Sequence, residues 1–465
     1  MIFRMKQPRE HWGSRLGLIL AAAGSAVGLG SIWRFPYIVG ENGGGAFVLL
    51  YILFTLILGI PVFVAEVVIG RKSQKGPIQA YGDLRPQSEN WKMIGWLNMF
   101  TCFLILSYYC VIAGWCTSYI LMSLGQFWQG RSPAEVQNTF NILSGSPDIS
   151  IFWLFIYIFL NIGIVLAGIR KGIEHWSRIL MPAFVVILFS LFGYCMFLKG
   201  FPQAAKFVLY PDFTKLTANS ILQALGMAFF TLSVGLGIIL TYGSYMKESE
   251  DVPKMGLTVA GLTIVISIIS ALVIFPIVFT FDLPAQGGPG LIFQTMPVIF
   301  SQMPGAIFFS TIFFVLVVFI ALTSSISLLE VLVANLIENF KISRNKAVMY
   351  AGLGIFLLGI PCALSGSSAL FGNWKAIYGR DFLDTLDYIT ANWMMPFAGL
   401  FAVLFVGWFL DKKVVENEFK SGTALQKLYP FWRFSVRWIA PTAVIIIILQ
   451  EAGIIQFEKI LTFMN

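Results

Sequence analysis

The chain of 465 residues is 57% hydrophobic and only 12% charged, and its mean hydropathy is +0.80. This composition excludes a soluble globular domain and indicates a protein that crosses a membrane many times. Basic loops beside the membrane account for the net charge of +8 at pH 7, so no nucleic-acid partner is predicted.

Eleven apolar segments follow one another along the chain. Several exceed the 20 or so residues needed to cross a bilayer, so tilted or kinked helices are expected. The pattern predicts an all-α integral membrane fold with eleven transmembrane helices. The expected spans are residues 15–38, 46–69, 94–124, 151–169, 177–198, 219–245, 256–281, 305–337, 347–364, 387–410 and 434–457.

A short glycine motif recurs in the two halves of the chain. Residues 26–30 (AVGLG) interrupt the first segment, and residues 233–237 (SVGLG) interrupt the sixth. Paired glycines weaken a helix, and irregular backbone at membrane depth is tolerated only where protein buries it or where it lines a polar cavity. Close packing through small residues is the alternative for either motif alone. As a matched pair, the motifs favour a secondary transporter with its binding site at two broken helices.

Basic residues fall mainly on one side of the predicted membrane. With a cytoplasmic amino terminus, most of the 31 lysines and arginines lie in inner loops and helix ends. The positive-inside rule therefore predicts that the amino terminus is cytoplasmic and that the carboxyl terminus lies outside. Because the chain has no Asn-x-Ser/Thr sequon, we interpret it as an integral protein of a bacterial inner (plasma) membrane, in contact with the lipid bilayer.

Charged residues inside apolar segments are costly, so each one predicts a specific contact. Glu66, in the second segment, is predicted to be a structural polar group that accepts hydrogen bonds from backbone freed at the breaks. A position facing the headgroups is the alternative. Arg34 and Asp387 are predicted to form a gate on the outer side, and Arg9 and Glu338 a gate on the inner side. Exposed ion pairs contribute under about 1 kcal/mol, which suits a gate that must open.

Hydroxyl groups lie at the same depth as the glycine motifs. Thr323, Ser324 and Ser325 are in the middle of the eighth segment, and Thr231 and Ser233 adjoin the second motif. A membrane Ser or Thr often bonds only its own helix, which is the alternative interpretation. Sodium prefers several oxygen ligands, including carbonyls released by an unwound helix, and half-helix N-termini attract carboxylates. The clusters therefore predict a sodium site beside a carboxylate site.

Neither an enzyme nor a metal-binding framework is predicted. The sequence contains no arrangement of nucleophile and base and no cysteine or histidine motif with metal-ligand spacing. All five cysteines fall inside apolar segments, where they are typical packing residues; they are Cys102, Cys110, Cys116, Cys195 and Cys362.

Motifs distributed in order over nearly the whole chain resemble those of one family. They are GSAVGLGSIWRFP at 24–36, ENGGGAF at 41–47, the tyrosine pair at 108–109, FFTLS at 229–233, LTSS at 322–325 and DTLD at 384–387. The chain resembles bacterial amino-acid transporters of the neurotransmitter:sodium symporter family. The resemblance implies a single transporter domain over residues 1–465. Within it, residues 11–200 (helices 1–5) and 218–411 (helices 6–10) would be inverted repeats in which helices 1 and 6 are broken, and residues 412–465 would form a loop and helix 11.

The resemblance also implies a substrate site between helices 1 and 6. The substrate carboxylate would meet backbone N–H groups at Leu29 and Gly30 and the hydroxyl of Tyr109. Gly28 stands where amine-transporting relatives carry an aspartate, which leaves space for the α-carboxylate of an amino acid. The rest of the pocket is mostly apolar, and Leu236 replaces a bulky ring found in some relatives, so a neutral hydrophobic or aromatic amino acid is expected. The implied site residues are Ser25, Ala26, Gly28, Leu29, Gly30, Ile105, Tyr109, Phe230, Thr231, Ser233, Leu236, Ser324 and Leu328.

The chain matches the family's two sodium sites to different degrees. The second site would use carbonyls and hydroxyls of Gly24, Val27, Ile320, Thr323 and Ser324. In the first site, Ser31 and Thr263 stand in place of two asparagines, beside Ala26 and Thr231. Their hydroxyls reach less far than asparagine amides, so one Na+ is expected at the second site, and occupancy of the first site is left open.

Chloride is a further candidate ion. Tyr51, Thr231, Thr263 and Ser267 match the region where animal relatives hold chloride. Many chloride-independent bacterial relatives place an acidic group nearby, whereas Ser267 is not acidic.

The function implied by the resemblance is sodium-coupled import of the amino acid by alternating access. At 100 mV, one inward charge contributes about 2.3 kcal/mol and a tenfold sodium gradient adds roughly 1.4 kcal/mol, so one ion supports about 500-fold accumulation of a zwitterion. Two alternatives stay open. One is a non-transporting amino-acid sensor or receptor on the same fold. The other is a proton-coupled transporter in which Glu66 or Glu330 titrates.

Overall fold

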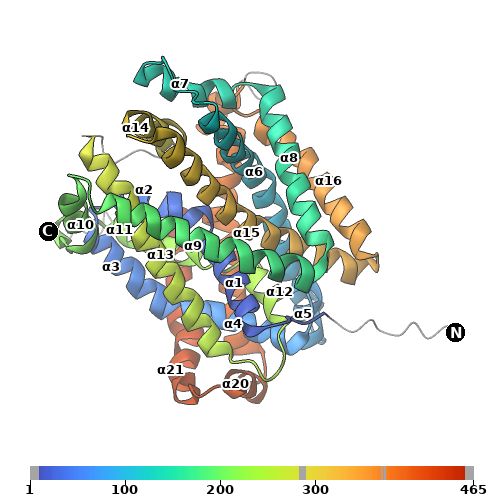
Figure 1. Ribbon diagram of the computed structural model, residues 1–465. Helices are drawn as coiled ribbons and strands as arrows, with labels where there is room; N and C mark the ends of the chain where they lie inside the picture. Colours follow the sequence, from blue (N-terminus) through green and yellow to red (C-terminus); the bar gives the residue numbers. More distant parts are fainter. Residues whose placement is uncertain (1–9, 282–289, 368–369, 371–372, 456–465) are drawn as a thin grey trace.

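The computed structural model describes residues 10–281, 290–367, 370 and 373–455, and its regular elements over this part of the chain are all helices (Figure 1). Elements labelled α are α-helices, and those labelled η are π- or 3-10-helical turns. In the first half they are α1 (Arg15–Leu29), η1 (Gly30–Arg34), α2 (Phe35–Glu41), α3 (Gly45–Phe54), η2 (Thr55–Gly59), α4 (Ile60–Ser73), α5 (Pro77–Leu84), η3 (Glu89–Trp91), α6 (Lys92–Leu124), α7 (Pro133–Ser144), α8 (Pro147–Leu166), η4 (Ile169–Glu174), α9 (His175–Cys195) and α10 (Phe201–Leu209).

The second half continues the helical pattern. Its elements are η5 (Phe213–Lys215), α11 (Ala218–Thr231), α12 (Ile238–Gly243), α13 (Val252–Thr280), η6 (Leu291–Thr295), α14 (Met296–Gln302), α15 (Ala306–Phe340), α16 (Arg344–Ala363), α17 (Trp374–Tyr378), α18 (Phe382–Ile389), η7 (Thr390–Met394), α19 (Met395–Leu404), η8 (Phe405–Phe409), α20 (Lys412–Lys420), η9 (Gln426–Leu428), α21 (Tyr429–Phe434), η10 (Ser435–Ile439) and α22 (Ala440–Glu451).

Ten described helices are long and apolar enough to cross a membrane, and they correspond to ten of the eleven predicted spans. They are Arg15–Glu41, Gly45–Ser73, Glu89–Leu124, Pro147–Leu166, Ile169–Cys195, Val252–Thr280, Ala306–Phe340, Arg344–Ala363, Phe382–Phe409 and Gln426–Glu451. The span predicted at 219–245 is divided into α11 and α12, of 14 and 6 residues, and neither half is long enough to cross alone. The fifth span begins earlier than predicted, because η4 continues into α9.

Both glycine motifs leave helical geometry. Gly28 has φ 40° and ψ −171°, which breaks the first helix before its C-terminal part, η1 and α2, continues. Between α11 and α12, Ser233, Gly235 and Gly237 have φ values of 53°, 81° and 72°. Positive φ costs little for glycine and more for residues with a Cβ, so the motif glycines permit both breaks.

Close packing holds the short half-helix α12 against α4. A Cβ added at Gly70 would lie only 1.9 Å from the carbonyl oxygen of Leu240. The long helix α15 packs against α1, α6 and α9. As a result, the break at Gly28 faces the middle of α15, and a Cβ there would lie 2.9 Å from Oγ of Ser324.

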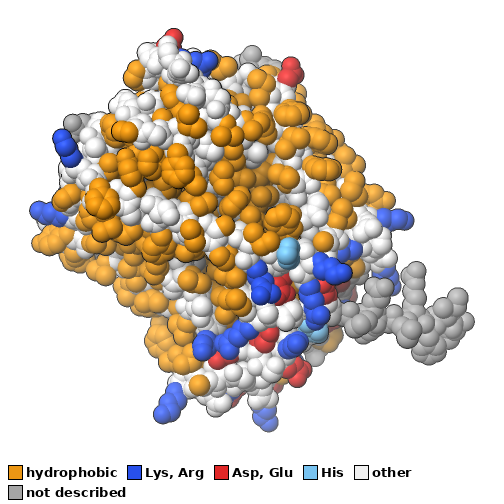
Figure 2. Space-filling model, in the orientation of Figure 1, with side chains coloured by type: hydrophobic (Ala, Val, Ile, Leu, Met, Phe, Trp, Pro, Cys, Tyr) orange, Lys and Arg blue, Asp and Glu red, His pale blue; other side chains and the backbone are white. Residues whose placement is uncertain are grey.

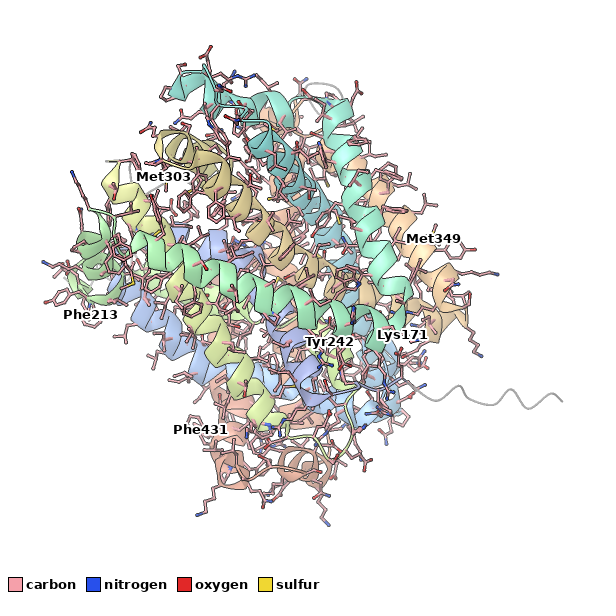
Figure 3. The ribbon with its side chains drawn as sticks, viewed as in Figure 1. Lys171, Phe213, Tyr242, Met303, Met349 and Phe431 are labelled. Carbon is pink, nitrogen blue, oxygen red and sulfur yellow. The ribbon has the colours of Figure 1, made fainter. Side chains whose placement is uncertain are left out.

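The surface divides into an apolar body and a basic end. Figure 2 shows hydrophobic side chains over the broad middle of the molecule and Lys and Arg side chains gathered at the end where α20 and α21 lie in Figure 1. In Figure 3, Tyr242 lies inside the bundle, whereas Met349 and Phe431 lie at its edge. The five cysteines are buried and free.

We expect the break at Gly235 to tolerate no side chain. In Gly235→Ala, the methyl group would lie 2.3 Å from the carbonyl oxygen of Met395, and the residue would be held at φ 81°. The strained backbone alone costs about 1–2 kcal/mol, so the melting temperature of the purified protein should fall by several degrees.

Gly261→Ala is the matched control, because nothing lies within 4 Å of its added Cβ and the residue lies inside α13. Alanine stabilises a helix interior by roughly 0.5–1 kcal/mol relative to glycine, so this variant should melt at or slightly above the wild-type temperature. Equal melting temperatures for both variants would contradict the assigned break.

Candidate functional site

A cavity of about 530 Å³ lies between the two broken helices, α6 and α15. Twelve of the thirteen predicted substrate residues line it: Ser25, Ala26, Gly28, Leu29, Gly30, Ile105, Tyr109, Phe230, Ser233, Leu236, Ser324 and Leu328. The exception, Thr231, is buried beside Tyr51 and accepts a hydrogen bond from its hydroxyl at 3.1 Å. The cavity therefore gathers residues that are more than 300 positions apart in the sequence.

The two breaks are joined by a direct hydrogen bond. Ser233 Oγ donates to the carbonyl oxygen of Ser25 at 2.9 Å. Ser324, from α15, donates to the same carbonyl at 3.2 Å and to the Gly24 carbonyl at 3.1 Å. Carbonyl groups released near the first break are thus held by hydroxyls from helices 6 and 8 of the predicted series.

Two hydroxyl groups beside the cavity have no hydrogen-bond partner. Ser25 Oγ and the Tyr109 hydroxyl are buried and unpaired, and both residues line the cavity wall. A buried polar group without a partner is costly. These two hydroxyls are therefore available to a polar ligand that enters the cavity.

The residues predicted for the second sodium site converge on one point of α1. The Thr323 hydroxyl lies 2.9 Å from the Gly24 carbonyl oxygen and 2.8 Å from the Ile320 carbonyl oxygen. Ser324 reaches the same Gly24 carbonyl. The Val27 carbonyl is at the break and accepts from the Gly30 N–H. Four of the five predicted groups therefore form one cluster of hard oxygen ligands, which is the chemistry that sodium prefers.

The residues predicted for the first sodium site are all buried, but some of their side-chain oxygens already form hydrogen bonds within their own helices and others do not. Ser31 Oγ has no partner. Thr263 donates to the Val259 carbonyl, and Thr231 to the Met227 carbonyl, each at 2.9 Å. Ala26 lines the cavity. Two of the side-chain ligands thus bond their own helices, which weakens this set relative to the second.

The candidate chloride residues form a small hydroxyl cluster. The Tyr51 hydroxyl lies 3.1 Å from Thr231 Oγ1 and 3.5 Å from Ser267 Oγ. Thr263, one turn before Ser267 on α13, is also buried. Hydroxyl donors of this kind are compatible with a bound anion.

Glu66 is buried and contacts the second break. Its exposed fraction is 1%, and its Oε1 accepts from the Gly235 N–H at 2.6 Å. Asn98 donates to the Gly235 carbonyl at 2.9 Å. The position facing the headgroups is therefore wrong for Glu66, because it lies in the interior at the break itself.

The predicted outer gate is unpaired in this structure. Arg34 and Asp387 both line the cavity, but no ion pair joins them. The Arg34 guanidinium lies 4.6 Å from the centre of the Phe230 ring, and Asp387 accepts from the Tyr108 hydroxyl at 3.0 Å. The space between the two charges belongs to the cavity, so this end of the site is open. For the predicted inner gate, Arg9 lies outside the described residues, and Glu338 accepts from the Gly76 N–H at 2.9 Å.

The N-terminal end of α1 is held by contacts that the sequence analysis missed. Glu174 accepts from the Gly13 N–H at 2.6 Å and from the Ser14 hydroxyl at 2.7 Å. Reciprocally, Glu10 accepts at 3.0 Å from the backbone N–H groups of Ile169 and Arg170. The starts of α1 and η4 thus cap each other. A sequence signal existed, because both glutamates stand beside predicted helix starts, where carboxyl groups are favourable.

Glu330 is engaged in a buried ion pair. Its carboxylate lies 2.5 Å from Arg344 and accepts from the Tyr245 hydroxyl at 2.7 Å. A paired, hydrogen-bonded carboxylate is a structural contact, and this arrangement disfavours Glu330 as a titrating transport group.

The comparisons with known proteins agree with this geometry. The sequence model of the sodium:neurotransmitter symporter family matches residues 9–142 and 145–464. The chain belongs to this family. It is therefore a sodium-dependent symporter rather than an enzyme, and it is an integral membrane protein.

Individual relatives of this family cover almost the whole chain. The uncharacterized sodium-dependent transporter YhdH of Bacillus subtilis is 36% identical over 97% of this chain and 100% of its own length. The sodium-dependent dopamine transporter of Caenorhabditis elegans is 28% identical over 80% of this chain and 70% of its own. The crystal structure of MhsT in complex with L-phenylalanine is 40% identical and superposes with a TM-score of 0.87 over 95% of this chain and 99% of that one.

We expect Glu66→Gln and Glu66→Leu to differ sharply. The glutamine carbonyl can still accept from the Gly235 N–H, whereas leucine leaves that donor buried without a partner, at a cost of about 1–3 kcal/mol. Sodium-dependent uptake and the melting temperature should be retained in Glu66→Gln and reduced in Glu66→Leu. If Glu66→Gln uncouples uptake from sodium and Glu66→Leu does the same, Glu66 has a titrating role rather than a structural one.

Proposed function

We propose that the protein imports a neutral hydrophobic or aromatic amino acid together with sodium, by alternating access. The observation that carries the proposal is the cavity at the two breaks, which is apolar along Ile105, Leu236 and Leu328 and has unpaired hydroxyls at Ser25 and Tyr109. An apolar wall with a few polar groups is typical of a site for a hydrophobic amino acid. The phenylalanine complex of MhsT, 40% identical, supports the same class of substrate.

The cavity also supports a pose for the substrate. The α-carboxylate would lie near the N–H groups of Leu29 and Gly30, with the Tyr109 hydroxyl as an additional donor. The α-ammonium would face the oxygens at Ala26, Thr231 and Ser233. The absence of an acidic side chain at Gly28 suits a zwitterion, because a second carboxylate there would repel the substrate's own.

One sodium ion at the second site is the proposed coupling ion. The convergence of Thr323 and Ser324 on the Gly24 carbonyl supports it. The ion would tie α1 to α15, so it favours the arrangement in which the outer part of the site is assembled. The first site, at Ser31 and Thr263, would bind a second sodium ion more weakly. The hydroxyls around Tyr51 would bind a chloride ion.

The repeats, gates and orientation complete the proposal. Residues 11–200 and 218–411 would be inverted repeats, which is supported by a break in the first helix of each half. Arg34 and Asp387 would approach each other when the cavity closes, and Arg9 with Glu338 would serve the inner side. The basic end in Figure 2 supports a cytoplasmic amino terminus in a bacterial inner membrane.

Uptake into proteoliposomes tests the function directly. We expect an inward sodium gradient to drive uptake of radiolabelled phenylalanine or leucine, with a Hill coefficient for sodium near one. Thr323→Val removes a hydroxyl ligand at nearly constant volume, so it should raise the half-saturating sodium concentration at least tenfold. Thr311→Val is the matched control, because it makes the same change on α15 at a hydroxyl that has no partner and that lines a separate pocket.

Other outcomes would identify the alternatives. Saturable binding without flux indicates a receptor, and uptake driven by a pH step without sodium indicates proton coupling. A Hill coefficient near two would show that the first site is also occupied. Unchanged uptake after replacing chloride with gluconate would contradict a chloride site at Tyr51.

We expect Leu236→Phe to change the preference among substrates. The larger ring would fill part of the cavity beside Ile105, so aromatic substrates should lose affinity by about 10-fold or more relative to alanine or valine. Competition against radiolabelled substrate gives the ratio of inhibition constants. An equal loss for all amino acids would mean that residue 236 does not face the substrate side chain.

A further inference from the structure

Two arginines in the last spanning helix have no acidic partner. Arg433 and Arg437 lie one turn apart, in α21 and η10 of the span Gln426–Glu451. Neither takes part in the ion pairs formed within the described ranges. Arg437 lies in the first turn of the predicted span 434–457, and its Nε is buried without a hydrogen-bond partner. Because an unpaired charge in a spanning segment is costly, these guanidinium groups require an anion.

The local backbone holds both arginines at a seam between two spans. Arg433 donates to the Val406 carbonyl at 2.6 Å, and Trp408 donates from Nε1 to the Arg437 carbonyl at 3.1 Å. A Cβ on Gly407 would lie 3.2 Å from the Val436 carbonyl, so the glycine allows this close approach. The seam joins two π-helical turns, η8 and η10, and such turns occur frequently at functional sites.

Most of the donor groups of this seam are not used by the protein. A guanidinium carries five N–H donors, whereas Arg433 makes one hydrogen bond to a carbonyl and Arg437 lies with its guanidinium carbon 4.3 Å from the centre of the Trp408 ring. Stacking on the ring fixes the plane of the guanidinium and leaves its edge free. An edge of this kind binds phosphate oxygens in a bidentate manner.

The aromatic residues around the two arginines are exposed near the basic end of the bundle. Trp408 and Trp438 are 44% and 52% exposed, and their rings meet edge to face at 4.8 Å. Phe431, two residues before Arg433, lies at the edge of the bundle in Figure 3. Arg85 donates to the Phe409 carbonyl and brings a third positive charge to the same helix end. Tryptophan prefers the depth of the headgroups, and arginine side chains extend toward that depth.

We propose that this seam binds one anionic phospholipid, with its phosphate on Arg433 and Arg437 and its acyl chains along Trp408 and Trp438. Basic pockets between transmembrane helices bind such headgroups, and a phosphate supplies the missing counter-charge. The site lies outside the central cavity and does not depend on the substrate or the coupling ion. The bound lipid would stabilise the contact between the spans Gln426–Glu451 and Phe382–Phe409.

The test uses the full-length protein in neutral detergent with added phosphatidylglycerol, phosphatidylcholine or inorganic phosphate. Native mass spectrometry counts bound lipid, and a thermal melt reports its effect. We expect retention of one phosphatidylglycerol and a melting temperature several degrees above that with phosphatidylcholine. Each arginine contributes about a fivefold gain in affinity, so Arg433→Gln with Arg437→Gln should weaken binding about 30-fold. Lys346→Gln, an exposed basic residue on α16, is the control and should bind like wild type.

Two further measurements keep the outcome decisive. If the double variant does not fold, Arg437→Lys retains the charge and loses the bidentate edge, and it should keep stacking on Trp408 while binding the lipid several-fold more weakly. Equal retention of phosphatidylglycerol and phosphatidylcholine by wild type would overturn the proposal. So would a melting shift reproduced by inorganic phosphate alone, or one unchanged in the double variant.

Discussion

The constraint on which this structure depends is the need to satisfy peptide groups that two broken helices expose far from water. Glu66 accepts from the Gly235 N–H, Asn98 donates to its carbonyl, and Ser233 donates to the Ser25 carbonyl. Each unsatisfied peptide group inside a membrane costs several kcal/mol. The surrounding helices therefore carry polar side chains exactly where an unbroken bundle would carry apolar ones, and those side chains fix the breaks at 28 and 235.

The polar groups that are not used to satisfy the broken helices define the site. Ser25 and Tyr109 have unpaired hydroxyls beside the cavity, and Thr323 and Ser324 share the Gly24 carbonyl. Hydroxyls that bond a carbonyl without an ion can turn their lone pairs toward a cation and coordinate it with that carbonyl. The hydroxyls that bond the Gly24 carbonyl are therefore the same groups that are proposed to coordinate sodium.

Much of the fold was predictable because membrane spans and glycine breaks are local signals. The lengths of the apolar segments predicted ten of the described spans, and the paired glycine motifs predicted the positions of both breaks. Contacts between distant residues were less predictable. The position of Glu174 beside a predicted helix start favours a capping role, but it does not indicate that the partner would be Ser14. Likewise, nothing near Arg34 shows that it would stack on Phe230 rather than pair with Asp387. The partner that each side chain contacts depends on how the helices are rotated and on how far the cavity is open. Composition and periodicity give no information on either.

The start of α1 and the contact between α4 and α12 differ in how easily water can replace their interactions. Glu174 and Glu10 bind backbone N–H groups at the starts of α1 and η4, and water can take over those hydrogen bonds once these segments separate. By contrast, Gly70 brings α4 against the Leu240 carbonyl with no room for water. Separation at the capped ends costs exchanged hydrogen bonds, whereas separation of α4 from α12 opens a dry, close-packed contact. The carboxylate contacts at the start of α1 therefore cost less free energy to separate than the contact between α4 and α12, although the buried Trp12 ring also packs this end against Tyr242.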